Sequence, residues 1–135
     1  MAPAPMWTVD AFPRRVQSGA RDRMLGAMQS DLFRTPDSPP ASEHTETLAS
    51  FGGARVERIV SWGHASPDGF WYEQDEAEWV AVLAGRARLR FEDPSESVEL
   101  TAGEHLLIAP HRRHRVEWTL PEKPTVWLAV FSREP

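Results

Sequence analysis

The sequence contains no cysteine among its 135 residues. Disulfide bonds, thiolate metal ligands and a cysteine nucleophile are therefore excluded, and the redox compartment stays undetermined. Long apolar runs are also missing. No stretch approaches the roughly 20 apolar residues of a membrane span, and Pro13, Arg14 and Asp22 interrupt the region where a signal peptide would be continuously apolar. These absences predict a cytoplasmic protein with no membrane partner.

The chain also lacks an excess of basic residues. Its formal net charge is -5, and acidic and basic residues are interspersed along it. A nucleic-acid-binding surface needs a concentrated basic patch, so we expect no nucleic-acid partner. The length is that of a single domain with one hydrophobic core.

The first 50 residues show no sustained hydrophobic periodicity. Isolated apolar residues alternate with Pro, Ser, Arg and Asp, and Pro36, Pro39 and Pro40 interrupt any helical pattern beyond residues 21–29. We therefore predict a largely irregular, proline-rich N-terminal extension over residues 1–50, followed by a folded domain over residues 51–135. The acidic run of residues 43–46 is expected to be a solvated loop.

From Arg55 onward, short β-rich runs are separated by Gly, Pro and Asp, which is typical of an all-β domain. Gly85 separates two of these runs and predicts a tight antiparallel hairpin between them. Such a number of short strands indicates a sandwich or a closed barrel. The predicted strands cover residues 56–61, 70–74, 78–84, 86–91, 98–100, 105–108, 114–118 and 126–131.

Strand alternation places several polar side chains among apolar ones. His114 shares a face with Val116 and Trp118, and Glu78 shares a face with two valines. The face opposite Glu78 is apolar too, since it carries Trp79. A buried carboxylate needs a partner, a metal ion or a proton. Glu78 and His114 are therefore the first candidates for a functional site.

These residues carry a resemblance to the cupins. The pattern Tyr72-x-Gln74, Glu78 and Gly85 resembles the first cupin motif, in which two His separated by one residue precede a Glu and a Gly. Gly103 and His114, with the apolar stretch between them, resemble the second motif. The resemblance implies an all-β, jelly-roll or double-stranded β-helix barrel over about residues 55–131, in a small single-domain bacterial cupin.

Two departures from the family pattern leave the activity open. Tyr72 and Gln74 stand where the two metal-binding His are usual, whereas Glu78 and His114 match the other two ligand positions. One interpretation is a divalent metal ion (Zn, Mn, Fe or Ni) held by Gln74, Glu78, His114 and Tyr72. Another is a metal-free set of hydrogen-bonded groups around an ordered water.

The same groups are consistent with three functions. Glu78 and His114 could transfer a proton while Tyr72 donates to a developing oxyanion, which suits isomerisation or epimerisation of a small polar molecule. A non-catalytic binding or sensing module is the alternative, because a barrel of this size holds one small ligand. A barrel filled by its own side chains is the third class. Whether the protein is an enzyme stays open.

Other residues are assigned to the pocket and to an interface. Trp118 and Phe70 are expected on the pocket wall, and His64 lies in a loop that could overhang the barrel mouth. The apolar face that carries Trp79 predicts a homodimer built on sheet contacts. A small-molecule ligand and a second copy of the chain are thus the expected partners.

Overall fold

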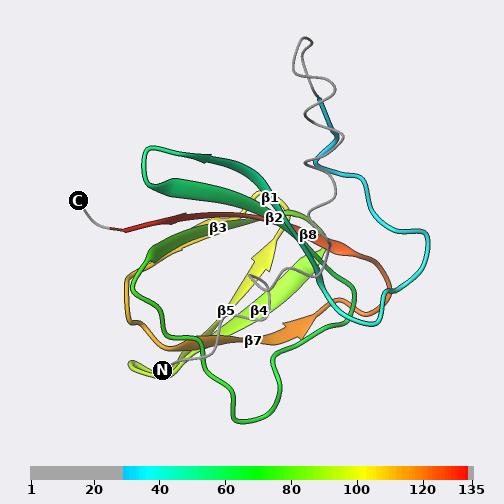
Figure 1. Cartoon of the computed structure of the whole chain (residues 1–135). Coiled ribbons are helices and arrows are strands. Elements are labelled where there is room, and N and C mark those ends of the chain that lie inside the picture. The colour runs from blue at the N-terminus through cyan, green and yellow to red at the C-terminus, as the bar shows by residue number, and fades with distance from the viewer. Residues whose placement is uncertain (1–28, 134–135) are drawn as a thin grey trace.

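The computed structural model describes residues 29–133 (Figure 1). Residues 1–28 lie outside this range, as do the last two residues. Nearly all of residues 21–29, where the sequence has a short helical pattern, is therefore not described. The described part contains eight strands: β1 (His44–Phe51), β2 (Ala54–Ser61), β3 (Ala77–Ala84), β4 (Arg86–Phe91), β5 (Glu96–Thr101), β6 (His105–Ile108), β7 (His114–Thr119) and β8 (Thr125–Ser132).

The strands form two antiparallel sheets that face each other in Figure 1. One sheet has five strands in the order β1-β2-β8-β3-β6, and the other has three in the order β5-β4-β7. The described residues contain no helix, and none therefore has the length and apolar character to cross a membrane. The all-β class and the jelly-roll architecture predicted from the sequence are confirmed.

The strand assignment needs two corrections. Strand β1 was not predicted, although it pairs with β2 along its length, so the expectation of irregular structure up to residue 50 is wrong from His44 onward. The acidic run is not a solvated loop either: Glu43 is buried and accepts a short hydrogen bond from Ser61. Conversely, residues 70–74 form no strand but a single bridge, between Tyr72 and His114.

The predicted hairpin at Gly85 is also wrong. Strands β3 and β4 are consecutive but belong to different sheets, so Gly85 is where the chain crosses from one layer to the other. Its φ of 89° requires glycine, and its backbone lies directly against Thr125 and Pro124. The crossing is fixed by Thr125, whose side-chain oxygen accepts from the backbone N–H of Arg86 at 3.2 Å.

The core lies between the inner faces of the two sheets. Its largest buried side chains include Trp127 and Phe131 from β8 and Phe91 from β4. The indole N–H of Trp127 donates to the Ser61 hydroxyl at 3.0 Å, which satisfies the polar atom that this ring brings into the core. Glu78 and His114 are inserted into this apolar layer with no exposed surface. The fold therefore places two ionisable groups inside the barrel.

Candidate functional site

Glu78 and His114 meet across the barrel interior, from β3 in one sheet and β7 in the other. The His114 Nε2 atom lies 3.5 Å from Oε1 of Glu78, and both residues are 0% exposed. Within its own sheet, Glu78 is opposite Phe131 and His114 is opposite Phe91, so each lies beside a buried aromatic ring. The pairing predicted from the cupin-like spacing is thus present in the structure.

The orientation of the imidazole is set by the backbone. Nδ1 of His114 lies 2.8 Å from the carbonyl oxygen of Arg112. A carbonyl only accepts, so Nδ1 carries the hydrogen, and in the neutral ring Nε2 presents its lone pair to the Glu78 carboxylate. Two acceptors facing each other in an apolar interior repel. A proton or another positive charge between them relieves that repulsion.

Tyr72 and Phe70 form an aromatic wall beside the imidazole. The backbone of Tyr72 exchanges two hydrogen bonds with His114, of 2.7 and 3.1 Å, and its ring centroid lies 5.5 Å from that of the imidazole. Phe70 packs edge-on against Tyr72 at 4.7 Å. The structure therefore places Tyr72 next to His114, with Phe70 packed against Tyr72.

The loop between β2 and β3 is fastened to β7 at a second point. The backbone N–H of Ser66 donates to the Val116 carbonyl, and the Val116 N–H donates to the Ser66 hydroxyl, both at 2.9 Å. Arg115 adds a hydrogen bond to the Ser66 carbonyl oxygen. Together with the Tyr72 bridge, these bonds hold the loop over one side of the buried pair.

Gln74 completes the group with a hydrogen bond from its amide nitrogen to Oε1 of Glu78, at 3.2 Å. The other carboxylate oxygen of Glu78, Oε2, is buried and accepts no hydrogen bond. Such an atom would suit a metal ion. The imidazole and this carboxylate are nevertheless only two strong ligands, and Gln74 turns a donor towards the carboxylate.

The set does not fit a conventional metal centre. Catalytic zinc sites have three protein ligands and structural sites four. Within residues 29–133 there is no group of three His, Asp or Glu side chains arranged to hold a metal ion. The four residues therefore lack the ligand set that such a centre needs.

Two residues assigned to the pocket from the sequence lie elsewhere. A β-bulge in β7 breaks the alternation after Val116, so Trp118 is opposite Arg88 and its ring lies under the Arg88 guanidinium at 5.2 Å. His64 lies in the loop after β2, where its Nδ1 accepts from the backbone N–H of Trp62 and its Nε2 contacts the Pro40 carbonyl oxygen. The ring therefore ties two loops together, and neither residue reaches the Glu78–His114 pair.

Three charged residues near the site were not found from the sequence. Arg55 donates from Nε to Glu57 at 2.5 Å and forms two bonds to the Glu76 carboxylate, at 3.1 and 3.3 Å. Its guanidinium lies over the ring of Phe131, the strand neighbour of Glu78. Burial raises the pKa of Glu57; the Arg55 charge and hydrogen bond oppose this, and the charges of Glu78 and Glu76 add to it.

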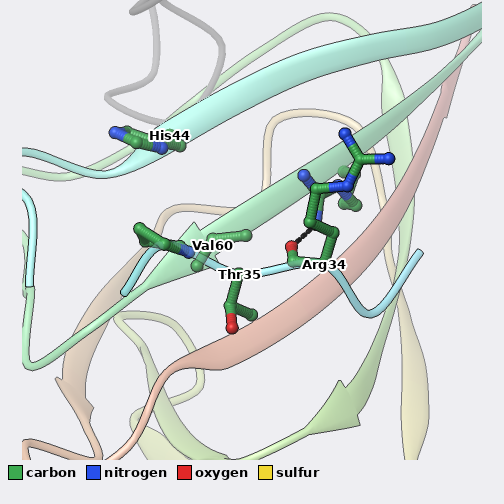
Figure 2. Close-up of a pocket in the computed structure, with 6 residues that line it drawn as sticks. Arg34, Thr35, His44 and Val60 are labelled. Atoms are coloured by element: carbon green, nitrogen blue, oxygen red, sulfur yellow. Dashed lines mark hydrogen bonds between the residues drawn. The ribbon is translucent and has the colours of Figure 1, made fainter. Parts of the chain in front are cut away.

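A shallow groove on the outside of the five-stranded sheet is a separate feature. It is lined by Arg34, Thr35, Pro36, His44, Arg58 and Val60. Figure 2 shows His44 on β1 and Val60 on β2. Thr35 and its neighbour Arg34 lie beside Val60 in the same view. Partial burial lowers the pKa of His44, and the positive charges of Arg58 and His64 lower it further. No lining residue of the groove belongs to the Glu78–His114 site.

A jelly-roll barrel with an inward-facing Glu and His at these positions defines a small cupin. The cupin domain model matches residues 63–131, about half of the chain, and the chain belongs to this family. A candidate mannose-6-phosphate isomerase from Ralstonia eutropha JMP134 has a similar structure, with 37% sequence identity and a TM-score of 0.75 over 80% of this chain and 100% of that one.

Other similar structures share the fold at lower identity. A cupin superfamily protein from Desulfitobacterium hafniense DCB-2 has 13% identity and a TM-score of 0.60, over 73% of this chain and 84% of that chain. A structure from a study of DMSP lyases has 20% identity and a TM-score of 0.57, over 67% and 47%. No curated protein matches the sequence.

Proposed function

We propose that this cupin binds a small polar molecule beside the Glu78–His114 pair and moves a proton on it, as in an isomerisation or epimerisation. The observation that carries the proposal is the buried approach of His114 Nε2 to Glu78 Oε1 at 3.5 Å, with the opposite ring nitrogen held by the Arg112 carbonyl. The relative described as a candidate mannose-6-phosphate isomerase supports this class of reaction.

The pair supplies the parts that proton transfer requires. Nε2 of His114 takes a proton from a carbon next to a carbonyl group, and the Glu78 carboxylate stabilises the imidazolium that forms. The same imidazolium returns the proton to the neighbouring carbon, while the hydroxyl proton passes from one enediol oxygen to the other, so no oxidant or further reactant is consumed. The Tyr72 hydroxyl is proposed to donate to the oxyanion of the enediol intermediate. Non-catalytic binding of a ligand remains the alternative function.

Deuterium exchange tests the catalytic proposal without knowledge of the natural substrate. In D₂O, the protein is expected to accelerate exchange at the carbon next to the carbonyl of hydroxyacetone or dihydroxyacetone, measured by proton NMR. His114→Asn should lower the rate by about 10²–10⁴-fold, the usual contribution of a general base. His105→Asn is the control, because His105 is exposed and packs on Trp79 outside the barrel.

Equal rates in wild type and His114→Asn would contradict the catalytic proposal. A ligand that raises the melting temperature by mass action and is recovered unchanged would then favour the binding module.

The predicted metal ion has a direct test of its own. With only two strong ligands, the protein purified without chelator or metal-affinity tag is expected to contain much less than one equivalent of Zn, Mn, Fe or Ni, measured by mass spectrometry of the elements. One equivalent that disappears in Glu78→Ala would overturn this expectation. It would instead support the set of Gln74, Glu78, His114 and Tyr72 as a metal site.

We also propose that the outer face of the five-stranded sheet forms a homodimer. Leu107, Trp79, Val130 and Val56 are in register across four neighbouring strands, and Leu107 is 66% exposed. A partly exposed apolar row of this kind is typical of an interface, and two-fold homodimers are the commonest assemblies. The molar mass of the full chain in solution measures this directly.

A further inference from the structure

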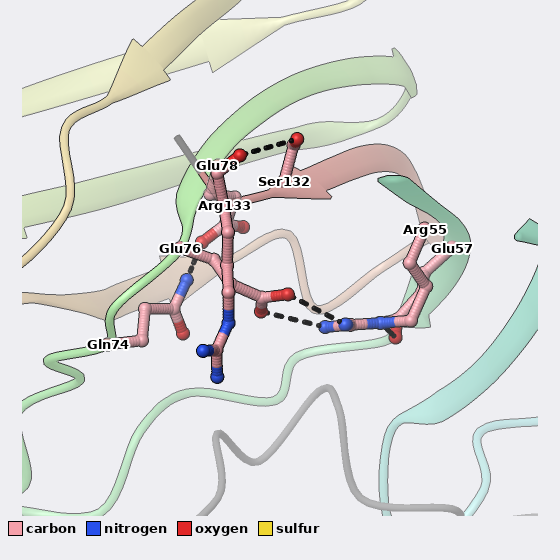
Figure 3. Close-up of polar contacts among 7 residues, drawn as sticks. All are labelled: Arg55, Glu57, Gln74, Glu76, Glu78, Ser132 and Arg133. Carbon is pink, nitrogen blue, oxygen red and sulfur yellow. Dashed lines mark hydrogen bonds and ion pairs between the residues drawn. The ribbon is translucent and has the colours of Figure 1, made fainter. Parts of the chain in front are cut away.

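Three carboxylates lie at the end of the barrel that holds Glu78, together with the guanidinium groups of Arg55 and Arg133, which Figure 3 draws with them. Glu57 is on β2, Glu76 directly precedes β3 and Glu78 is its second residue, while Arg55 lies between the first two (Figure 3). The Arg55 guanidinium donates to two of these carboxylates, those of Glu57 and Glu76. Three of its five N–H donors are thus engaged, and the three carboxylates outnumber the two guanidinium groups.

Two carboxylate oxygens in this group are buried and accept no hydrogen bond. They are Oε1 of Glu57 and Oε2 of Glu78, from residues that are 3% and 0% exposed. A buried acceptor without a donor costs about 1–3 kcal/mol, and more when it is charged. Native interiors leave few such atoms, and each is a candidate for a partner that is bound from outside.

The strand register shows that the two carboxylates belong to one wall. Glu57 lies opposite Ala129 on β8, and Glu78 lies opposite Phe131 on the other side of that strand. Ala129 projects only a methyl group into the barrel beside Glu57, whereas the buried ring of Phe131 lies beside Glu78. The charge of Glu78 also contributes to raising the pKa of Glu57, as expected for neighbouring carboxylates.

We infer that the small molecule bound by this barrel carries a positive charge, an ammonium or a related group, which Glu57 Oε1 and Glu78 Oε2 receive. The inference rests on the proposed function and narrows its ligand to an organic cation. A phosphorylated or carboxylated ligand would bring a further negative charge against the unpaired oxygens of Glu57 and Glu78. A metal ion does not take this place, because the described residues offer no group of three suitable ligands.

Three molecules of matched size test the charge of the ligand. Ethanolamine, ethylene glycol and glycolate differ mainly in carrying an ammonium, a hydroxyl or a carboxylate, and their dissociation constants are measured by calorimetric titration of the full chain in EDTA. Ethanolamine is expected to bind tightest. Glu57→Gln should weaken ethanolamine at least about tenfold, the loss expected for one hydrogen bond to a charged group, while Glu122→Gln, which removes an exposed carboxylate from the β7–β8 loop, should not.

Glu78→Gln serves as a second variant should Glu57→Gln fail to fold, and it is expected to weaken ethanolamine similarly. Tightest binding of glycolate, equal binding of all three, binding by none, or an unchanged affinity in both variants would overturn the inference. Failure of the proposed function is distinguishable. Glycolate binding that is lost in His114→Asn would support a ligand site at the Glu78–His114 pair but contradict a positively charged ligand. Ethanolamine binding without any deuterium exchange would support a positively charged ligand but contradict the proposed catalysis.

Discussion

Replacing either Glu78 or His114 with leucine is expected to lower the free energy of unfolding by about 3–5 kcal/mol, whereas replacing both should cost clearly less than the sum. Each single change leaves an ionisable group in a site with no exposure and removes the group that faces it at 3.5 Å. The double change leaves an apolar interior. Urea unfolding of the four proteins measures the difference, and a constant m-value shows that the transitions are comparable.

An exposed ion pair provides the control for this cycle. Arg113 and Glu92 are 3.2 Å apart with side chains 47% and 43% exposed. Their coupling, measured by the same four-protein cycle, should be below about 1 kcal/mol. Strictly additive costs for Glu78→Leu and His114→Leu would show that the two residues do not interact, and would remove the basis of the proposed proton transfer.

The second large effect is expected at the crossing between the two sheets, where Gly85→Ala should destabilise the protein by about 3–5 kcal/mol. A Cβ atom at this position would lie 2.4 Å from Oγ1 and 2.6 Å from Cα of Thr125, and 2.8 Å from the Pro124 carbonyl oxygen. The backbone φ of 89° adds strain for any L side chain. Equilibrium unfolding in urea measures the loss.

Gly103→Ala separates the two contributions. Gly103 has nearly the same backbone conformation, with φ of 92°, but a Cβ there would meet nothing within 4 Å. Its replacement should cost only about 1–2 kcal/mol, from the positive φ alone. Equal costs at both glycines would mean that the close approach of β8 to Gly85 contributes nothing to stability.

The sequence was sufficient for the fold and for the centre of the site. Strand alternation with Val116 places His114 inside, and the spacing from Tyr72 to Gly85 identifies Glu78 through the cupin motif. Both inferences rely on local periodicity within strands that do form, β7 before its bulge and β3. The meeting of these two residues then follows from the family fold, because they come from different sheets.

The remaining site residues depend on contacts that local periodicity does not encode. The β-bulge in β7 places Trp118 on the face opposite His114. A bulge of this kind has no recognisable signal in a run of β-forming residues, so the sequence did not predict it. Glu57 was missed because the outer face of β2, with Val56 and Val60, is more apolar than its inner face, so alternation predicts that Glu57 faces solvent.

The fastening of the loop between β2 and β3 affects how quickly a ligand can reach the site. Ser66 and Tyr72 form hydrogen bonds with the backbone of β7. Glu78, in the barrel interior, has no exposed surface. A ligand that enters past this loop must wait for those bonds to open. The association rate of such a ligand is then limited by local opening of the loop rather than by diffusion. The same hydrogen bonds slow dissociation, so a bound molecule stays longer in the barrel.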